Sequence, residues 1–127
     1  MTPLFKIHRS YTVRSATILT NAYVVGSLID ASDCNQLVLY VTFVKGSLTS
    51  GDIKISFGNN GINYFQESTG SFNAGTTTEY ANIHRFSFDG IYRLVVPVMD
   101  NFVKIEAIGI GTVTDSSLAV SAYVGTV

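Results

Sequence analysis

The sequence predicts an all-β protein, folded as a single antiparallel β-sandwich of about eight strands. Short runs rich in β-branched and aromatic residues alternate with clusters of Gly, Asn, Asp and Ser, which is the pattern of strands and turns. Apolar residues nowhere recur over a dozen positions with the spacing of an amphipathic helix. The 127 residues fit one domain that is large enough to bury a substantial core.

The strand pattern divides the chain into an N-terminal arm, residues 1–10, and a sandwich domain, residues 11–127. Pro97 should end its strand, because proline has no backbone N–H to donate to a ladder. The expected strands are, in order, Tyr11 to Ala16, Tyr23 to Ile29, Gln36 to Val44, Asp52 to Phe57, Asn63 to Ser68, Glu79 to Phe88, Ile91 to Val96, Phe102 to Ile110 and Leu118 to Val124.

Two of these strands predict how the sheets are covered. Apolar and polar residues alternate from Asp52 to Phe57, with apolar residues on one face and Lys54 and Ser56 on the other. The face with Lys54 and Ser56 should therefore be exposed to water. The run "LVLYVTFV" from Leu37 is apolar at nearly every position, which predicts a central strand covered on both faces. The second cover should come from another segment or another subunit.

The composition points in the same direction. Charged residues make up 13% of the chain, against about 25% in a typical soluble domain. So few charges suggest that part of the surface is buried against other subunits, so a homo-oligomer is expected. The net charge of −1 gives no reason to expect nucleic acid or a membrane as partner. The N-terminus lacks the apolar region of a signal peptide, which suggests synthesis in a cytoplasm.

Two stretches predict tight connections. Asp89-Gly90 stands between two aromatic-rich runs and predicts a β-hairpin, because these residues tolerate the positive φ angles of such turns. The loop from Gly58 to Gly61 joins two further strands, and its asparagines should form the turn. The alternative is a glycan-binding loop, in which an aromatic ring stacks on a sugar and amides bond to its hydroxyls. The residues of that alternative are Asn59, Asn60, Asn63 and Tyr64.

No catalytic, metal-binding or cofactor-binding residue is expected. His8 and His84 form none of the histidine or cysteine spacings typical of zinc sites. His84 should be a partly buried strand residue, and the single cysteine, Cys34, a structural thiol. Two enzymatic alternatives depend on the fold: a cleft that brings two carboxylates together, or a histidine such as His84 beside Cys34.

The N-terminal segment mixes apolar and basic side chains. One interpretation is an ordinary first strand with a frayed start. The other is an arm that lies on a partner, with apolar anchors and arginine contacts. The partner-binding residues of this second interpretation are Leu4, Phe5, Lys6, Ile7, Arg9, Tyr11 and Arg14.

Two segments resemble small β-sandwich virion proteins of tailed bacteriophages. In "DCNQLVLYVTFVKGSLTSGDIKISFGNNGINYFQES", Asp33 to Ser68, an apolar strand leads through a Lys-Gly-Ser turn to an alternating strand, an Asn-Gly turn and an aromatic pair. "FDGIYRLVVPV", Phe88 to Val98, is similar to the Gly-Tyr-Arg strand of these proteins, which ends at a proline. The loop from Gly58 departs from the Asp-Gly turn and tryptophan of discoidin-like carbohydrate-binding sandwiches, which weakens the glycan alternative.

The resemblance implies a jelly-roll-like sandwich with a non-enzymatic structural role in a virion. It implies a capsid decoration or auxiliary protein that binds the major capsid protein and stabilises the phage head lattice. Other virion proteins are alternative partners, if the chain belongs to the neck or tail. The oligomer implied is a trimer, because decoration proteins often cap three-fold positions of capsids.

Overall fold

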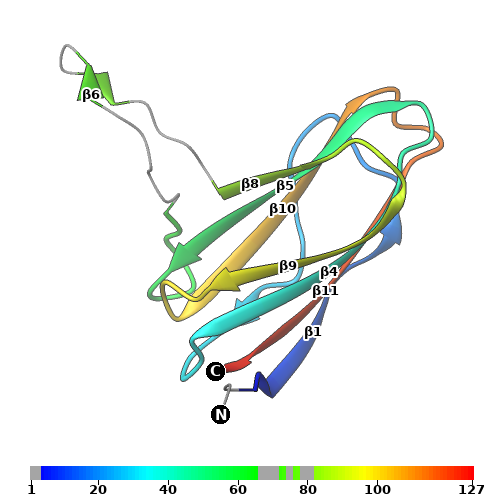
Figure 1. The fold of residues 1–127 in the computed structure, drawn as a ribbon. Coiled ribbons are helices and arrows are strands. Elements are labelled where there is room, and N and C mark those ends of the chain that lie inside the picture. The colour runs from blue at the N-terminus through cyan, green and yellow to red at the C-terminus, as the bar shows by residue number, and fades with distance from the viewer. Residues whose placement is uncertain (1–3, 66–71, 74–75, 78–81) are drawn as a thin grey trace.

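The computed structural model describes residues 4–65, 72–73, 76–77 and 82–127, and these residues form strands and loops without a helix. Nine strands form two antiparallel sheets that face each other across the core (Figure 1). The strands are β1 (Lys6–Thr17), β2 (Val24–Val25), β3 (Ile29–Asp30), β4 (Gln36–Val44), β5 (Leu48–Gly58), β8 (Asn82–Phe86), β9 (Gly90–Pro97), β10 (Phe102–Gly111) and β11 (Ser117–Thr126). β6 (Phe72–Asn73) pairs with β7 (Thr76–Thr77) in a separate two-stranded sheet.

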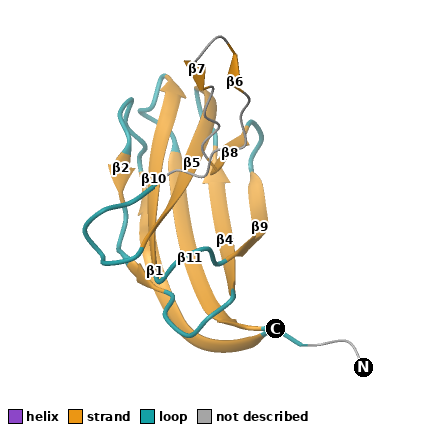
Figure 2. Cartoon of the chain, turned by 90° about the vertical axis from the view of Figure 1, so that its left-hand side faces the viewer, coloured by secondary structure: helices purple, strands orange, loops and turns teal. Residues whose placement is uncertain are grey.

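Sheet A has the strand order β1-β11-β4-β9, and sheet B the order β2-β10-β5-β8 with β3 also paired to β10. When β2 and β3 are counted as one interrupted strand, eight strands alternate between the two sheets except from β5 to β8, which both lie in sheet B, as in a jelly roll. The predicted sandwich and jelly-roll topology are confirmed. Figure 2 shows β1, β11, β4 and β9 side by side in sheet A.

One expected strand, Tyr23 to Ile29, is interrupted. Between β2 and β3, the N–H of Gly26 bonds to the carbonyl of Ile105 in sheet B, and the N–H of Ser27 bonds to that of Val13 in sheet A. The chain therefore leaves the ladder to bridge the two sheets. A Cβ at Gly26 would lie 2.5 Å from the carbonyl oxygen of Val13, so only glycine fits this approach.

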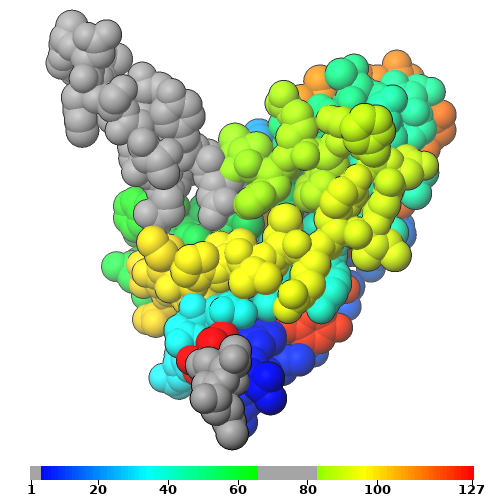
Figure 3. Space-filling model, viewed as in Figure 1, coloured from blue at the N-terminus to red at the C-terminus, as the bar shows by residue number. Residues whose placement is uncertain are grey.

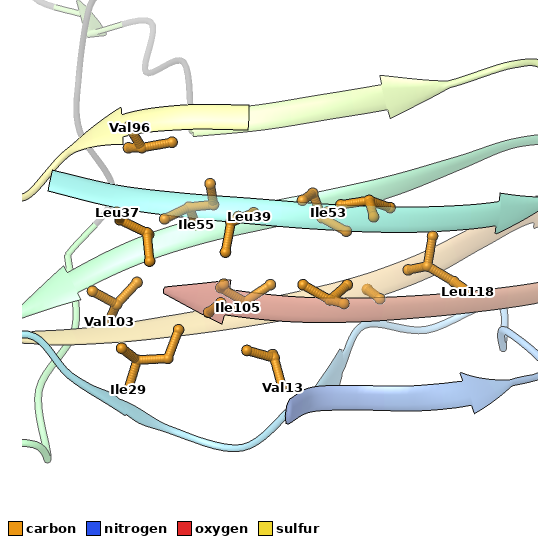
Figure 4. Packing of buried hydrophobic residues seen from close by; sticks show 14 of the residues in the cluster. Val13, Ile29, Leu37, Leu39, Ile53, Ile55, Val96, Val103, Ile105 and Leu118 are labelled. Carbon is orange, nitrogen blue, oxygen red and sulfur yellow. The ribbon is translucent and has the colours of Figure 1, made fainter. Parts of the chain in front are cut away.

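Alternating side chains build the core. On β5, Ile53, Ile55 and Phe57 point inward and are buried, as the alternation predicts. The expectation that the other face is exposed to water is wrong for Ser56, which is 3% exposed. Lys54 on that face is half-buried, because Tyr23 and Glu106 lie beside it. β4, β10 and β11 contribute in the same way, and the inward side chains of the two sheets pack against each other in the core (Figure 4). The strand that begins at Phe102 ends at Gly111, close to its predicted bounds.

The hairpin predicted at Asp89-Gly90 is wrong. β8 pairs with β5 in sheet B and β9 pairs with β4 in sheet A, so this connection carries the chain between the sheets. Gly90 does not have a positive φ angle. Asp89 has a different role, because its carboxylate accepts a 2.7 Å hydrogen bond from the N–H of Lys45 in the β4–β5 turn.

The first strand begins closer to the N-terminus than expected. β1 begins at Lys6, which pairs with Thr126 of β11, so residues 6–10 of the expected arm lie in sheet A. β5 begins at Leu48, before its expected start at Asp52. The strand expected from Asn63 to Ser68 shows a single bridge, Phe57↔Phe65, and its later residues lie outside the described part, as do residues 79–81 of the strand expected from Glu79. The remaining bounds agree closely. In the part of the chain that the structure describes, no helix has the length and apolarity needed to cross a bilayer.

Candidate binding surface

The outer face of β4 carries apolar side chains that the chain covers only in part. Val38 is buried, whereas Tyr40 and Val44 are 41% and 43% exposed. β4 lies centrally in sheet A, between β11 and β9, as the apolar run predicts. The sequence predicts that the strand is covered on both faces. On its outer face, however, this chain buries Val38 and leaves Tyr40 and Val44 partly exposed.

The edge strand β9 extends this apolar surface. Ile91 and Val95 lie on the outer face, opposite Thr42 and Val38 of β4, and Ile91 is 75% exposed. Figure 3 shows β9 in yellow at the surface of the molecule. Exposed apolar side chains that gather on one face, rather than being scattered singly, are typical of interaction sites.

A groove crosses this face at the end where β1 begins. Its volume is about 380 Å³, and its lining residues are Phe5, Ile7, Val38, Tyr40, Arg93 and Tyr123. The two tyrosine rings meet edge to face, with centroids 5.6 Å apart and an interplanar angle of 87°. This geometry is the favoured one for aromatic pairs, so it fixes the position of both rings in the wall of the groove.

The structure separates the predicted partner-binding residues into two groups. Arg9, Tyr11 and Arg14 form hydrogen bonds with groups of the chain itself. Arg9 donates to the carbonyls of Asp30 (3.1 Å) and Ser32 (2.6 Å), and the hydroxyl of Tyr11 donates to the carbonyl of Asp30 (3.2 Å). Arg14 donates to the carbonyls of Thr17, Ile18 and Leu118. These three residues hold β1 to its neighbours.

The other four predicted residues lie at the start of β1. Leu4 is 85% exposed, and Lys6 is also exposed. Phe5 and Ile7 line the groove. The structure therefore brings two residues of the predicted set together with side chains of β4, β9 and β11 that the sequence did not single out.

Arg93 is the charged residue of the groove. It lies opposite Tyr40 in the β4–β9 ladder and is exposed. No described residue forms a hydrogen bond or ion pair with its guanidinium, in contrast to Arg9, Arg14 and Arg85. The strands of sheet A carry Lys6, Arg9, Arg14 and Arg93 and no carboxylate.

The outer face of sheet B is different, because its charges are paired. The carboxylate of Asp52 is buried and accepts two hydrogen bonds of 2.9 Å from Arg85, which raise the pKa of that arginine. Glu106 lies 3.7 Å from both Lys54 and Lys104. The ladder registers bring Arg85 to Asp52 and Lys54 to Glu106 across neighbouring strands, which residue spacing in the sequence could not show. Lys104 and Glu106 lie two apart on one strand and so share a face by alternation alone.

Two tyrosines complete the face of sheet B. The ammonium group of Lys54 lies 4.2 Å from the ring centroid of Tyr23, and that of Lys104 lies 5.0 Å from the ring centroid of Tyr64. Burial, and then the charge of Asp52, raise the pKa of Tyr23. These contacts belong to the folded chain by itself.

Of the residues in the glycan alternative, Asn60 is a turn former. Its side-chain oxygen accepts hydrogen bonds of 2.9 Å from the N–H groups of Ile62 and Asn63, which is an Asx turn. Gly61 adopts a φ of 73° within the same loop. The prediction that the asparagines form the turn is confirmed for Asn60.

The other residues of that alternative do not form an open sugar platform. Asn59 is exposed, but the ring of Tyr64 is half-buried beside Lys104, and its hydroxyl is buried without a hydrogen-bond partner among the described residues. Phe65, its neighbour, is exposed. A stacking site needs an accessible ring face, and Lys104 lies over one face of the half-buried ring of Tyr64.

A histidine does lie near the cysteine, but it is not His84. Cys34 Sγ is 3.8 Å from His8 Nδ1, and His8 Nε2 is 3.3 Å from the hydroxyl of Thr126. Arg9 also donates to Cys34 Sγ, at 3.6 Å. Sequence spacing could not pair residues 26 positions apart. Among the described residues, no group of three His, Cys, Asp or Glu side chains could hold a metal ion.

No protein-family model matches the sequence, and no curated protein matches it. Solved structures are similar at low identity. A Bacillus endospore appendage protein of the disulfide-linked pili is 13% identical, with a TM-score of 0.51 over 98% of this chain and 92% of that chain. The SPBc2 prophage-derived protein YomS is 16% identical, with a TM-score of 0.48 over 98% of both chains. VP2 of the infectious bursal disease virus subviral particle is 16% identical, with a TM-score of 0.42 over 93% of this chain and 32% of that chain. At such identities, the likeness to the appendage protein shows a shared β-sandwich fold.

Proposed function

We propose that the chain is a non-enzymatic structural protein of a virion, and that it decorates and stabilises the lattice of a phage head. The observation that carries this proposal is the outer face of sheet A, where apolar side chains are exposed around a groove. The sequence resemblance of Asp33 to Ser68 and Phe88 to Val98 to phage virion proteins supplies the class of partner. The major capsid protein is then the surface that covers this face.

The charges of sheet A favour a partner over a face-to-face dimer. Its strands carry four basic residues and no carboxylate. A two-fold contact between two such faces would bring like charges together, which opposes association. A cyclic trimer, in which different surfaces of neighbouring copies meet, leaves the face free for the lattice. The number three comes from the resemblance to decoration proteins alone. Sedimentation velocity should show a trimer, and a monomer at high micromolar concentration would contradict self-association.

Attachment can be tested with phage heads assembled without this chain. The wild-type protein should co-sediment with the heads, whereas Ile91→Lys, on the exposed outer face of sheet A, should stay in the supernatant. The matched control is Ile83→Lys, because Ile83 is also an exposed isoleucine but lies in β8 of sheet B, opposite Lys54. Absence of the wild-type chain from both heads and purified virions would contradict the virion role. Equal binding of the two variants would contradict the choice of face.

Two alternatives remain within reach of simple experiments. Co-sedimentation with tails instead of heads would place the chain in the neck or tail. Binding to a glycan array that Tyr64→Ala abolishes would favour a carbohydrate-binding module, which the half-buried ring of Tyr64 disfavours. A disulfide-linked fibre is disfavoured too, because these 127 residues hold one cysteine, and one disulfide per chain can link only two copies.

A further inference from the structure

We infer that the groove on the outer face of sheet A binds an extended apolar peptide segment of a partner protein, and that Arg93 holds a carboxylate of that segment. The inference rests on the proposed docking role of this face and adds the chemistry of the segment that it accepts. An apolar groove alone would accept many surfaces. The position of one arginine in the groove restricts the ligand to one that carries a negative charge.

The state of the four arginines is the first step. Arg9 and Arg14 donate to backbone carbonyls, and Arg85 forms a bidentate pair with Asp52. Arg93 has no such partner among the described residues, although it carries the same planar set of donors. A guanidinium matches a carboxylate through two parallel hydrogen bonds, as Arg85 and Asp52 show in this molecule. Arg93 is thus available to a carboxylate from outside.

The rest of the lining sets the character of the ligand. Phe5, Ile7 and Val38 offer hydrocarbon, and the pair of Tyr40 and Tyr123 offers aromatic edges and faces. The volume of about 380 Å³ lies near the lower end of the range for ligand-binding pockets, roughly 300–1,000 Å³. It suits one or two apolar side chains next to an acidic one. Buried aromatic anchors beside an arginine are also the usual energetic centre of a protein interface.

Other occupants fit less well. A nucleic acid would need several cations along its backbone, and the groove offers one. A second copy of the same face has no carboxylate to offer. Among the described side-chain carboxylates elsewhere on the chain, Asp33 is the exception that forms no described bond. The others are bound to groups of the chain itself: Asp30, Asp52, Asp89, Asp100, Asp115 and Glu106. A carboxylate from a different protein therefore fits best.

The test uses the full chain and two dye-labelled, end-blocked peptides, Phe-Val-Glu-Val-Phe and its counterpart with Gln in place of Glu. Fluorescence anisotropy should show that the Glu peptide binds about tenfold more tightly, which corresponds to about 1.4 kcal/mol. Arg93→Met, which keeps an apolar stem, should remove this preference and leave the Gln peptide unaffected. Lys104→Met, a loss of charge on the face of sheet B, should change neither affinity. Thermal unfolding should confirm that both variants are folded.

Equal affinity of wild-type protein for the two peptides, or no binding of either at about 1 mM, would overturn the inference. So would displacement of the Glu peptide by a single-stranded oligonucleotide that binds through Arg93, since the site would then prefer phosphate. Failure of the virion role gives a different result, because the chain would be missing from heads while the Glu preference persisted. If the chain attaches to heads through this face but the Glu preference is missing, only the carboxylate inference falls.

Discussion

The two sheets share one core, but their outer faces differ in how the charged side chains are paired. On sheet B, the arginine, lysine and carboxylate side chains of β5, β8 and β10 form ion pairs, and two of the lysines also cover tyrosine rings. On sheet A, Arg93 has no described partner, and Ile91 and Val95 are largely exposed. This chain, with only 13% charged residues, thus pairs its charges on sheet B, whereas Arg93 on sheet A has no partner among the described residues.

Substitution of Asp52 should give the largest change in stability. Its carboxylate is buried and accepts two short hydrogen bonds from Arg85. Asp52→Ala should lower the free energy of unfolding by about 2 kcal/mol in urea denaturation. The loss should stay below that of a fully buried pair, because the Arg85 side chain is 61% exposed and remains hydrated.

Arg93→Ala is the matched control on sheet A. Since Arg93 has no described partner, its removal should change the free energy of unfolding by less than about 0.5 kcal/mol. A loss as large as that of Asp52→Ala would show that Arg93 already has a stabilising role in the monomer. The contrast between the two faces would then be wrong.

The aromatic pair of sheet A should give a smaller effect. Tyr40 and Tyr123 meet edge to face on an exposed surface. A double-mutant cycle with Tyr40→Ala and Tyr123→Ala should show a coupling energy of about 1 kcal/mol in the free protein. Coupling near zero would mean that the groove wall is not held in place before a partner binds.

The lysine–glutamate cluster of sheet B should contribute less. Glu106 lies 3.7 Å from Lys54 and Lys104, beyond hydrogen-bonding distance, and the three side chains are partly hydrated. Glu106→Gln should lower the free energy of unfolding by about 0.5 kcal/mol, and about 1 M NaCl should reduce this difference, because salt screens such pairs. A difference that does not depend on salt would point to packing instead of charge.

Much of the fold could be predicted, because it depends on local patterns. Alternation gave the inward face of β5, and the unbroken apolar run gave the central place of β4. Two of the errors show the effect of tertiary structure. Asp89-Gly90 has the residues of a hairpin, but the strands on either side find better partners in different sheets. The strand expected from Tyr23 to Ile29 is divided because Gly26 and Ser27 bond to opposite sheets.

The candidate binding surface could be predicted only in part. The mixture of apolar and basic residues near the N-terminus drew attention to Phe5 and Ile7, which do line the groove. The same mixture gave no sign that Arg9 and Arg14 bind carbonyls of distant residues. Arg93 was missed because nothing in its local sequence distinguishes it from a paired arginine. Its availability follows from strand register, which single-sequence patterns do not specify.

The smallest expected effect is a pH dependence that arises from His84, on the edge strand of sheet B. His84 lies opposite Ile53, an inward-facing residue, and is partly buried as predicted. Burial lowers its pKa below the ordinary value of 6.5. As the pH falls below about 6.5, the unfolded chain therefore takes up a proton while the folded chain does not, so stability is lost until the folded-state pKa is passed. Unfolding curves between about pH 7 and pH 5 should show this loss, and His84→Gln should reduce it. Asp30 and Asp115 should not interfere, because hydrogen bonds from serines lower the pKa of both carboxyls below 3.8, outside this range. If His84→Gln retained the full pH dependence, a group other than His84 would be responsible for the loss of stability, and this prediction would be wrong.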